Sequence, residues 1–457
     1  MSKLIELDNF HRLAKSFMDE GKASSYEEAL GMLRKMRLAI RVGPQIAESS
    51  TLQAALLTAV NTGRRCFLGG VEICGQLDVP LRLGWPRQET LAEAVASLQG
   101  IQVESVPSDI PWVVIGDDLP KMDTSPFCVR AVCDGWRGGI IPIDSSKKIP
   151  LSMEFTPSGV LAGALAVSEA FQHLRGGNPY AGRRVLGLSL WEPERSEGWL
   201  DSDTGPEPRA LPSRAWLIGL GHLGQAYLWT LGLMPYTHRE EVELVLQDID
   251  ELSAANDSTS LLTSPGMIGM KKTRAMAAWC DAMGFRSRIV ERKFSSDFHV
   301  SRDEPNIGIC GVDNPEARRI LEDVGFDAVL EAGLGSTATD FLGFQVHSFP
   351  APRKAQDIWG IRDKSDDAKE NAPLPAAYQP KGPDGIDRCG LVQLAGRSVG
   401  SSFVGTVVST LVIADLIRIS MRGWRYATIV GDLRTGKIKS IRNPIPSDWI
   451  NPWLTYL

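Results

Sequence analysis

The chain has 457 residues, 43% of them hydrophobic, so it is long enough for two or three domains that each bury a core. Its 55 acidic residues exceed its 49 basic ones, and the net charge of −6 argues against a nucleic-acid partner, because binding a phosphate backbone usually needs a basic excess. Seven cysteines are scattered, mostly in apolar runs, and form no CxxC pair, which favours reduced thiols over a disulfide framework or structural zinc.

The amino-terminal stretch, residues 1–60, predicts a helical segment. Its first 36 residues mix acidic and basic side chains throughout, which favours amphipathic helices. No apolar core followed by a small-residue cleavage site occurs there, so the stretch does not resemble a secretory signal. Together with the cysteine usage, this predicts a cytoplasmic protein.

Residues 61–200 alternate between apolar runs and helical patterns, which predicts a first α/β domain. A phosphate-binding loop could fall only at "RRCFLGGVEICG", residues 64–75, which lacks the spacing G-x-G-x-x-G. We therefore expect this domain not to bind a nucleotide. The segment 201–213, "DSDTGPEPRALPS", is rich in proline, aspartate and serine and predicts a linker before a second α/β domain at 214–457.

The second domain opens with "RAWLIGLGHLGQAYLWTLGL", residues 214–233, in which three glycines stand between an apolar run and a helical pattern. A strand that leads through Gly219, Gly221 and Gly224 into a helix is typical of the phosphate-binding turn of a doubly wound sheet. The glycines allow a tight turn and a close approach to phosphates, and the helix N-terminus supplies N–H donors. By itself this signal fits any of several nucleotides.

Asp248 suits either NAD or ATP, and three further features favour ATP. Asp248 ends the strand pattern "VELVLQDID", where an acid can accept hydrogen bonds from a ribose. Asn256 follows in "ELSAANDSTSLL", and the basic pair Lys271 and Lys272 stands where a helix starts. Asp313, which ends "ICGVD", can hold Mg²⁺ against phosphates, and a lysine can neutralise the charge of departing pyrophosphate. Hydride transfer with NAD needs neither a metal-binding aspartate nor such a lysine.

Each of these residues also has a purely structural interpretation. Asp248 could cap a helix, Asn256 could serve in a turn, and Asp313 could be the N-cap of "NPEARRIL". The two lysines could belong to a solvated face. Their common order and spacing favour the nucleotide site.

The two α/β regions also resemble distant copies of each other. "IPWVVIGD" (110–117) parallels "NIGICGVD" (306–313), and "FCVRAVCDGWRGG" (127–139) parallels "FDAVLEAGLGSTA" (326–338). A third pair is "GALAVSEAF" (163–171) and "STLVIADLI" (409–417). The second copy carries a polar, proline-rich insertion at about 350–398, which is too long for an idle connection and predicts a functional loop.

The most apolar stretch, "FVGTVVSTLVIADLI", covers residues 403–417. It is shorter than the roughly 20 residues needed to span a bilayer, and it carries Asp415. It therefore predicts a buried helix and gives no reason to expect a membrane partner.

The motif order of residues 214–420 resembles the ubiquitin-activating enzyme superfamily, which includes the adenylyltransferases of thiamine and molybdopterin biosynthesis. The matching motifs are "GLGHLG", "DID", "AANDSTS", "GMKK", "VDNPEARR" and "VGSSFVGTVVSTLVIADLIR". The resemblance implies ATP and Mg²⁺ as cofactors. It implies that Gly219, Gly221 and Gly224 cradle the phosphates, Asp248 holds the ribose, Asn256 and Lys272 meet the phosphates, and Asp313 holds the metal. Lys272 is then also a catalytic residue.

One position departs from the family pattern. Relatives usually place an arginine three residues after the asparagine, and here Thr259 stands there. Lys271 and Arg274 are local substitutes. In the family an arginine also reaches across a dimer interface, and "LRKMRLAIR" offers Arg34, Arg37 and Arg41, although a solvated basic helix face is the commoner explanation for any one of them.

The resemblance implies two doubly wound, Rossmann-like adenylation domains that form an internal pseudo-dimer, with a degraded, inactive amino-terminal copy. Family members that activate ubiquitin combine one active and one inactive domain in this way. In layout the chain resembles activating enzymes of bacterial ubiquitin-like conjugation operons linked to antiviral defence. Whether two chains also associate as a homodimer stays open.

Cys389 is the cysteine that stands in a polar context, "DGIDRCGLVQLAG", at the end of the interrupted region. Relatives of the thioester-forming type carry their active cysteine near this place, so the resemblance implies that Cys389 takes the acyl group from the adenylate. The alternatives are a buried thiol or an enzyme that stops at the adenylate. Cys280 and Cys310 fall in a helix and a strand, where a buried thiol is ordinary packing.

The family assignment predicts an enzyme that adenylates the C-terminal carboxylate of a ubiquitin-like protein and transfers it, through a cysteine thioester, to a ubiquitin-conjugating-enzyme-like protein. Two alternatives remain. An NAD-dependent Rossmann dehydrogenase would also use the glycine loop and Asp248. A non-catalytic scaffold of the same fold would explain the missing arginine at Thr259.

Overall fold

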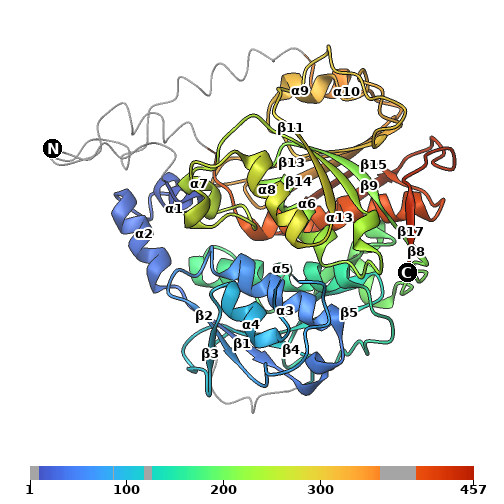
Figure 1. The fold of residues 1–457 in the computed structure, drawn as a ribbon. Helices are drawn as coiled ribbons and strands as arrows, with labels where there is room; N and C mark the ends of the chain where they lie inside the picture. Colours follow the sequence, from blue (N-terminus) through green and yellow to red (C-terminus); the bar gives the residue numbers. More distant parts are fainter. Residues whose placement is uncertain (1–9, 86, 118–125, 361–397) are drawn as a thin grey trace, which may run out of the picture.

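The computed structural model describes residues 10–85, 87–117, 126–360 and 398–457. Its two halves are each built on one β-sheet with helices, and helices from both halves pack together in the middle (Figure 1). The protein is therefore a mixed α/β structure with largely parallel sheets, as expected.

The amino-terminal half contains a seven-stranded sheet in the order β3-β2-β1-β4-β5-β6-β7. The first five strands in this order run parallel, and β6 and β7 are added antiparallel at one edge. Central strands such as β4 are wholly apolar and buried, as a parallel sheet covered on both faces requires. The elements are α1 (Arg12–Asp19), α2 (Tyr26–Lys35), β1 (Leu38–Val42), α3 (Ser50–Gly63), β2 (Val71–Cys74), α4 (Leu91–Ser97), β3 (Ile101–Val103), β4 (Trp112–Ile115), β5 (Cys128–Asp134), β6 (Arg137–Pro142), α5 (Thr156–Arg175) and β7 (Leu186–Ser189).

The carboxy-terminal half contains an eight-stranded sheet in the order β11-β10-β9-β12-β13-β14-β15-β16. Again the first five strands run parallel and the remaining ones antiparallel. The elements are β9 (Arg214–Ile218), α6 (His222–Gly232), β10 (Glu243–Gln247), α7 (Ala254–Asp257), α8 (Lys272–Ala282), β11 (Arg286–Val290), β12 (Ile307–Cys310), α9 (Pro315–Arg319), β13 (Ala328–Leu334), β14 (Gly343–Phe349), α10 (Ala355–Ile358), α13 (Ser402–Ser420), β15 (Tyr426–Asp432) and β16 (Lys437–Arg442).

The two sheets follow one topology. β1 and β9 hold the third place in their sheets, β4 and β12 the fourth, and β5 and β13 the fifth. The sequence parallels between 110–117 and 306–313 and between 127–139 and 326–338 therefore join strands in equal positions. The halves differ in the connection that leads to the long apolar helix. In the second half, the connection that precedes α13 contains the expected insertion, of which residues 361–397 lie outside the described residues.

Two expectations about the amino-terminal half are wrong. Residues 1–60 are not only helical, because β1 is the third strand of the first sheet, so this α/β half begins well before residue 61. The turn equivalent to the glycine loop is also not at 64–75. It follows β1 at Gly43, where Pro44–Ala47 forms a short 3-10 helix before α3.

The segment expected as a linker, residues 201–213, is partly ordered into a strand. Its end forms β8 (Ala210–Pro212), which pairs antiparallel with β17 (Leu454–Tyr456). The carboxyl end of the chain thus returns to the start of the second half.

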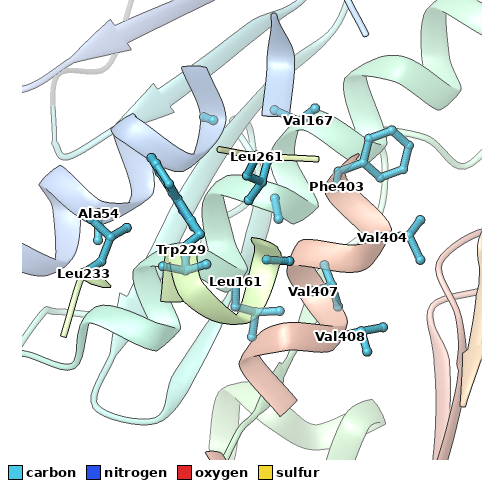
Figure 2. Close-up of a cluster of buried hydrophobic side chains, with 14 of the residues drawn as sticks. Ala54, Leu161, Val167, Trp229, Leu233, Leu261, Phe403, Val404, Val407 and Val408 are labelled. Carbon is cyan, nitrogen blue, oxygen red and sulfur yellow. The ribbon is translucent and has the colours of Figure 1, made fainter. Parts of the chain in front are cut away.

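Four helices fill the space between the sheets. α3 packs against α5 in one half and α6 against α13 in the other, and α5 contacts α13 across the junction. Figure 2 shows side chains from all four helices in one cluster, with Ala54, Leu161, Trp229 and Val407 among them. Polar groups also cross the junction, since Trp229 Nε1 donates to Thr58 Oγ1 at 3.0 Å.

Helix α13 forms the centre of this core. It is long and apolar enough to cross a membrane, but its apolar length is buried inside the protein. Asp415 lies within it without exposure and pairs with Arg418 on the next turn. This confirms the expected buried helix at 403–417.

Candidate functional site

The glycine loop connects β9 to α6, as the sequence predicts. Gly219 has a φ of +85°, in the left-handed region, and a Cβ there would lie 2.7 Å from Val312 Cγ1. A Cβ at Gly224 would lie 2.0 Å from the carbonyl oxygen of Gly219, so the first turn of α6 can approach the loop only without a side chain. A Cβ at Gly221 would meet none of the described residues within 4 Å. The loop therefore has open space in front of it at this residue.

The N-terminus of α6 begins at a glycine, which has no side chain of its own to cap the helix. Gly221 holds the N-cap position, and within the described part of the chain no side chain caps this end. The first N–H groups of a helix need an acceptor, and they carry the positive end of the helix dipole. An anionic group such as a phosphate can satisfy both requirements at this position.

Asp248 and Lys272 lie against the same loop. The Asp248 carboxylate accepts a hydrogen bond from the backbone N–H of Leu220 at 2.7 Å. Lys272 is the first residue of α8, and its Nζ lies 2.9 Å from Asp250 Oδ2 and 3.8 Å from Asp248 Oδ2. Its side chain is only 11% exposed, so the ammonium group is held beside the carboxyl ends of β9 and β10. The structure thus brings three parts of the predicted motif together.

Asn256 lies in the short helix α7, and its side chain has a structural role there. Its Oδ1 accepts hydrogen bonds from the Ser253 N–H at 2.9 Å and the Ser253 hydroxyl at 3.1 Å, which forms a capping box. This agrees with the interpretation of Asn256 as a turn residue and leaves its Nδ2 group as the donor for a ligand. Thr259, three residues on, is buried.

Asp313 ends the turn after β12, beside the glycine loop. Its neighbour Val312 contacts Gly219, and the Gly311 N–H donates to the Ile218 carbonyl at 2.9 Å. The Asp313 carboxylate is exposed, and the N-cap of α9 is Asn314, whose Oδ1 accepts from Glu316 N at 2.8 Å. Asp313 is therefore not the cap that the structural alternative proposed. A single exposed carboxylate next to the glycine loop fits Mg²⁺, which commonly takes one or two protein carboxylates and completes its shell with phosphates and water.

The arginines at the site come from positions that sequence reasoning missed. Arg65, at the end of α3, is buried and donates to the carbonyls of Ser260 at 2.8 Å and Leu261 at 3.0 Å, in the segment that follows Asn256. Burial lowers the pKa of its guanidinium. Arg64 pairs with Asp257 of α7 at 3.1 Å. The pair "RR" at 64–65 was visible in the sequence, but its place opposite α7 depends on how the halves pack.

The arginines proposed from the sequence have other partners. Arg37 forms an ion pair with Glu72, and the Arg41 guanidinium lies 5.7 Å from the Trp112 ring centroid, both within the amino-terminal half. Arg34 is exposed on α2. Of the local substitutes, Lys271 donates to the Ile249 carbonyl at 2.9 Å, and Arg274 pairs with Glu291 at 2.9 Å. From α1, by contrast, the backbone N–H of Arg12 donates to Ser258 Oγ at 3.2 Å, beside α7.

His222 is a second residue that sequence reasoning missed. It is the first residue of α6, within the motif "GLGHLG", and its ring packs against α13: a Cβ added at Gly405 would lie 2.5 Å from His222 Nε2. Burial lowers the pKa of His222 to about 4, opposed by the backbone of Ser401 and Ser402. The imidazole is therefore neutral near pH 7. The signal for this residue in the sequence was a histidine within the glycine-rich motif.

The cysteine proposed as nucleophile, Cys389, lies outside the described residues. Among the described ones, burial raises the pKa of the Cys66 and Cys310 thiols to about 12 and of the Cys128 thiol to about 11. It also raises the pKa of Cys280, on the inner face of α8. A thiolate is the reactive form, so these four are poor nucleophiles near neutral pH.

Taken together, one sheet edge carries a helix N-terminus open to an anion, a buried lysine and an exposed carboxylate. Lys272 and the N–H groups of α6 can neutralise phosphate charge, Asp248 is fixed beside the loop, and Asp313 can hold a divalent cation. No cluster of three or more histidine, cysteine or acidic side chains that could hold a metal alone occurs in the described ranges. This arrangement suits a nucleotide with its metal better than a metal bound by protein alone.

Comparison with known families gives matches in both halves. A family described as "BilD C-terminal domain" matches residues 211–423, and one described as "BilD N-terminal domain" matches residues 37–190. A curated relative, the bacterial E1-like protein BilD from Collimonas sp. (strain OK412), is 40% identical over 439 residues, which is 95% of this chain and 94% of the relative.

Solved structures give a more distant likeness. Crystal structures of E. coli MccB with MccA-N7isoASN and with succinimide each overlap with 51% of this chain, and with 64% and 63% of their own chains. Sequence identity is 12% in both, and the TM-scores are 0.32 and 0.31. This similarity is too low to guide the interpretation of the site.

Proposed function

The chain belongs to the BilD family of bacterial E1-like proteins, and on that premise we propose that it is an ATP-dependent activating enzyme for a ubiquitin-like protein. It adenylates the partner's C-terminal carboxylate, takes the acyl group onto Cys389, and passes it to a ubiquitin-conjugating-enzyme-like protein. The name of its relative, an E1-like protein, supports this class of reaction. We place the activity in the cytoplasm, in the context of antiviral defence.

One observation carries the proposal: no side chain of the described residues caps the N-terminus of α6, and Lys272 and Asp313 lie beside it. In the first step a carboxylate oxygen attacks the α-phosphorus of ATP, an acyl–phosphate bond forms, and pyrophosphate leaves with the negative charge that develops on it. Lys272 and the α6 N–H groups stabilise that charge. Asp313 would hold Mg²⁺, which would neutralise further charge on the phosphates.

In the second step the Cys389 thiolate attacks the acyl carbon, the carbon–oxygen bond to phosphate breaks, and AMP leaves. Burial raises the pKa of the Cys66, Cys128 and Cys310 thiols and makes them poor nucleophiles near neutral pH, which supports Cys389 over these three described cysteines.

The arginine missing at Thr259 is replaced, in this proposal, from the amino-terminal half. The Arg64 guanidinium pairs with Asp257 in the α7 segment that carries Asn256, and the backbone N–H of Arg12 donates to Ser258 beside it, which brings both residues to this segment. The amino-terminal half thus acts as the inactive member of an internal pseudo-dimer and supplies groups to the active one. Its own turn at Gly43 does not bind ATP.

Pyrophosphate exchange tests the first step and a reducible adduct tests the second. The protein, ATP, Mg²⁺ and candidate ubiquitin-like partners should exchange labelled pyrophosphate into ATP and give an adduct that a thiol reductant removes. Cys389→Ala should keep the exchange and lose the adduct, with Cys280→Ala as the matched control that keeps both. An adduct that survives in Cys389→Ala assigns the nucleophile to another residue, and calorimetry that finds NAD binding without ATP binding refutes the activating-enzyme proposal.

A further inference from the structure

A buried glutamate lies directly behind the candidate metal site. Glu331 is on β13, beside Cys310 in the register of the sheet, and its side chain is fully buried. Two basic side chains meet its carboxylate: Arg318 Nε lies 3.1 Å from Oε1, and His347 Nδ1 lies 3.0 Å from Oε2. His347 is its cross-strand neighbour on β14. A buried carboxylate is costly unless it is paired, so this cluster is fixed in position.

The cluster holds the turn that carries Asp313. Arg318 Nε donates to the carbonyl of Val312 at 2.8 Å, so the guanidinium ties Glu331 to the backbone one residue before Asp313. Val312 in turn packs against Gly219 of the glycine loop. The turn therefore takes its position from Arg318, while the Asp313 carboxylate stays exposed to a ligand.

The same cluster holds the segment that precedes residue 361. The Trp359 ring lies 5.6 Å from the Arg318 guanidinium and 5.3 Å from the His347 ring. Arg319 donates to the Trp359 carbonyl, and Glu322 accepts from the Ala355 N–H at 2.6 Å. Arg319 and Glu322 thus hold α10 and the residues after it, while Arg318 holds the Asp313 turn.

We propose that Arg318, Glu331 and His347 are positioning residues that hold the Asp313 turn and α10 with Trp359 in one register, so that the metal–nucleotide site and the segment 355–360 move together. This inference rests on the proposed function for its link to ATP, but the coupling is a property of the protein alone. Because the three side chains and Trp359 contact one another in a continuous chain, a disturbance at either end reaches the other.

His347→Gln is the sharpest test. His347 contacts Glu331 and Trp359, so it is linked to the Asp313 turn only through the other members of the cluster in the described part of the chain. In the protein without nucleotide, we expect hydrogen exchange at residues 311–314 to rise about tenfold together with that at 355–360. Arg318→Lys should give the same double response. Arg292→Lys is the matched control, since Arg292 likewise pairs with a carboxylate, Asp297, and lies over a ring, Phe298, but on the surface.

The Mg²⁺ dependence of pyrophosphate exchange tests the link to ATP. In His347→Gln, the Mg²⁺ concentration for half-maximal pyrophosphate exchange should rise about tenfold, with a smaller change in the rate at saturating Mg²⁺. Faster hydrogen exchange confined to 355–360, or an unchanged Mg²⁺ dependence in an active enzyme, overturns the inference. If the variants show the coupled change in hydrogen exchange but the wild-type protein binds no ATP, the proposed function is refuted and the coupling is still established.

Discussion

The two halves of the protein repeat one strand–turn–helix unit but treat the helix N-terminus in opposite ways. In the amino-terminal half, Ser49 caps α3 by accepting from the Leu52 N–H, and the Glu154 carboxylate accepts from the Thr51 N–H at 2.7 Å. In the carboxy-terminal half, Gly221 precedes α6 and no side chain caps it within the described residues. The same fold can therefore bind or refuse an anion, depending on whether the chain supplies its own carboxylate.

The turns before the two helices differ in the same sense. Pro44 follows Gly43 in the first half and has no N–H group, whereas the second half has Gly219 and Gly221 with open space in front of the loop. At the next strand ends, Asp117 pairs with Gln45 at 3.1 Å, while Asp313 is exposed beside the loop. The helix N-terminus and the strand-end aspartate thus both have internal partners in the first half.

The largest expected effect separates the two aspartates at equal sheet positions. Asp313→Ala should lower pyrophosphate exchange about a thousandfold, because a metal ion contributes several kcal/mol of charge stabilisation. Asp117→Ala, the matched change in the first half, should leave it unchanged. Both variants should keep the melting temperature of the parent, because both carboxylates are exposed. Equal losses in the two variants would contradict the assignment of the metal to one half.

The second prediction concerns the contact between the halves at Arg65. Arg65→Met keeps the buried stem but removes the guanidinium donors to the carbonyls of Ser260 and Leu261, which keep only one other donor each among the described residues, so the unfolding free energy should fall by about 2–4 kcal/mol in urea titration. Arg37→Met removes an arginine that is 37% exposed and should cost less than about 1 kcal/mol. If the two variants prove equally stable, Arg65 does not support the segment after Asn256.

The third prediction concerns His222, the buried histidine at the glycine loop of the second half. Its folded pKa is about 4 and its unfolded value is 6.5, so between these pH values the unfolded chain binds a proton that the folded chain refuses. Stability is thus full above pH 6.5 and falls as the pH drops towards 4, by about 3 kcal/mol at most from this residue. His222→Asn should flatten that fall in urea titrations from pH 7 to 4.5. An unchanged slope would mean that the ring is protonated in the folded state.

The smallest expected effect is on the self-capped helix. Glu154→Gln removes a negative charge from the N-terminus of α3 and should lower stability by about 1 kcal/mol, measured as a fall in melting temperature. Pyrophosphate exchange should not change. High salt screens the charge–dipole interaction, so the difference between parent and variant should shrink in concentrated NaCl. A variant with impaired exchange would place a catalytic group in the first half.

Much of the second half could be predicted from its sequence. The glycine loop, the strand ends at Asp248 and Asp313, the helix start at Lys272 and the buried helix at 403–417 all lie where local patterns place them. These features depend on residues close together in the chain: glycine spacing sets the turn, apolar runs set the parallel strands, and a break in either pattern marks an end. The paired copies 110–117 and 306–313 were readable for the same reason.

Tertiary structure alone decided which groups meet. β1 was hidden in a segment that looked helical, because five residues, four of them apolar, carry too little periodicity to show a strand before they pair with β2 and β4. The arginines opposite α7 proved to be Arg64 and Arg65, about 200 positions away in the chain, and the cluster of Glu331, Arg318 and His347 forms only when β13, β14 and α9 pack. Sequence spacing fixes periodicity within an element, whereas contacts between distant elements depend on how the apolar faces of the two halves are buried together.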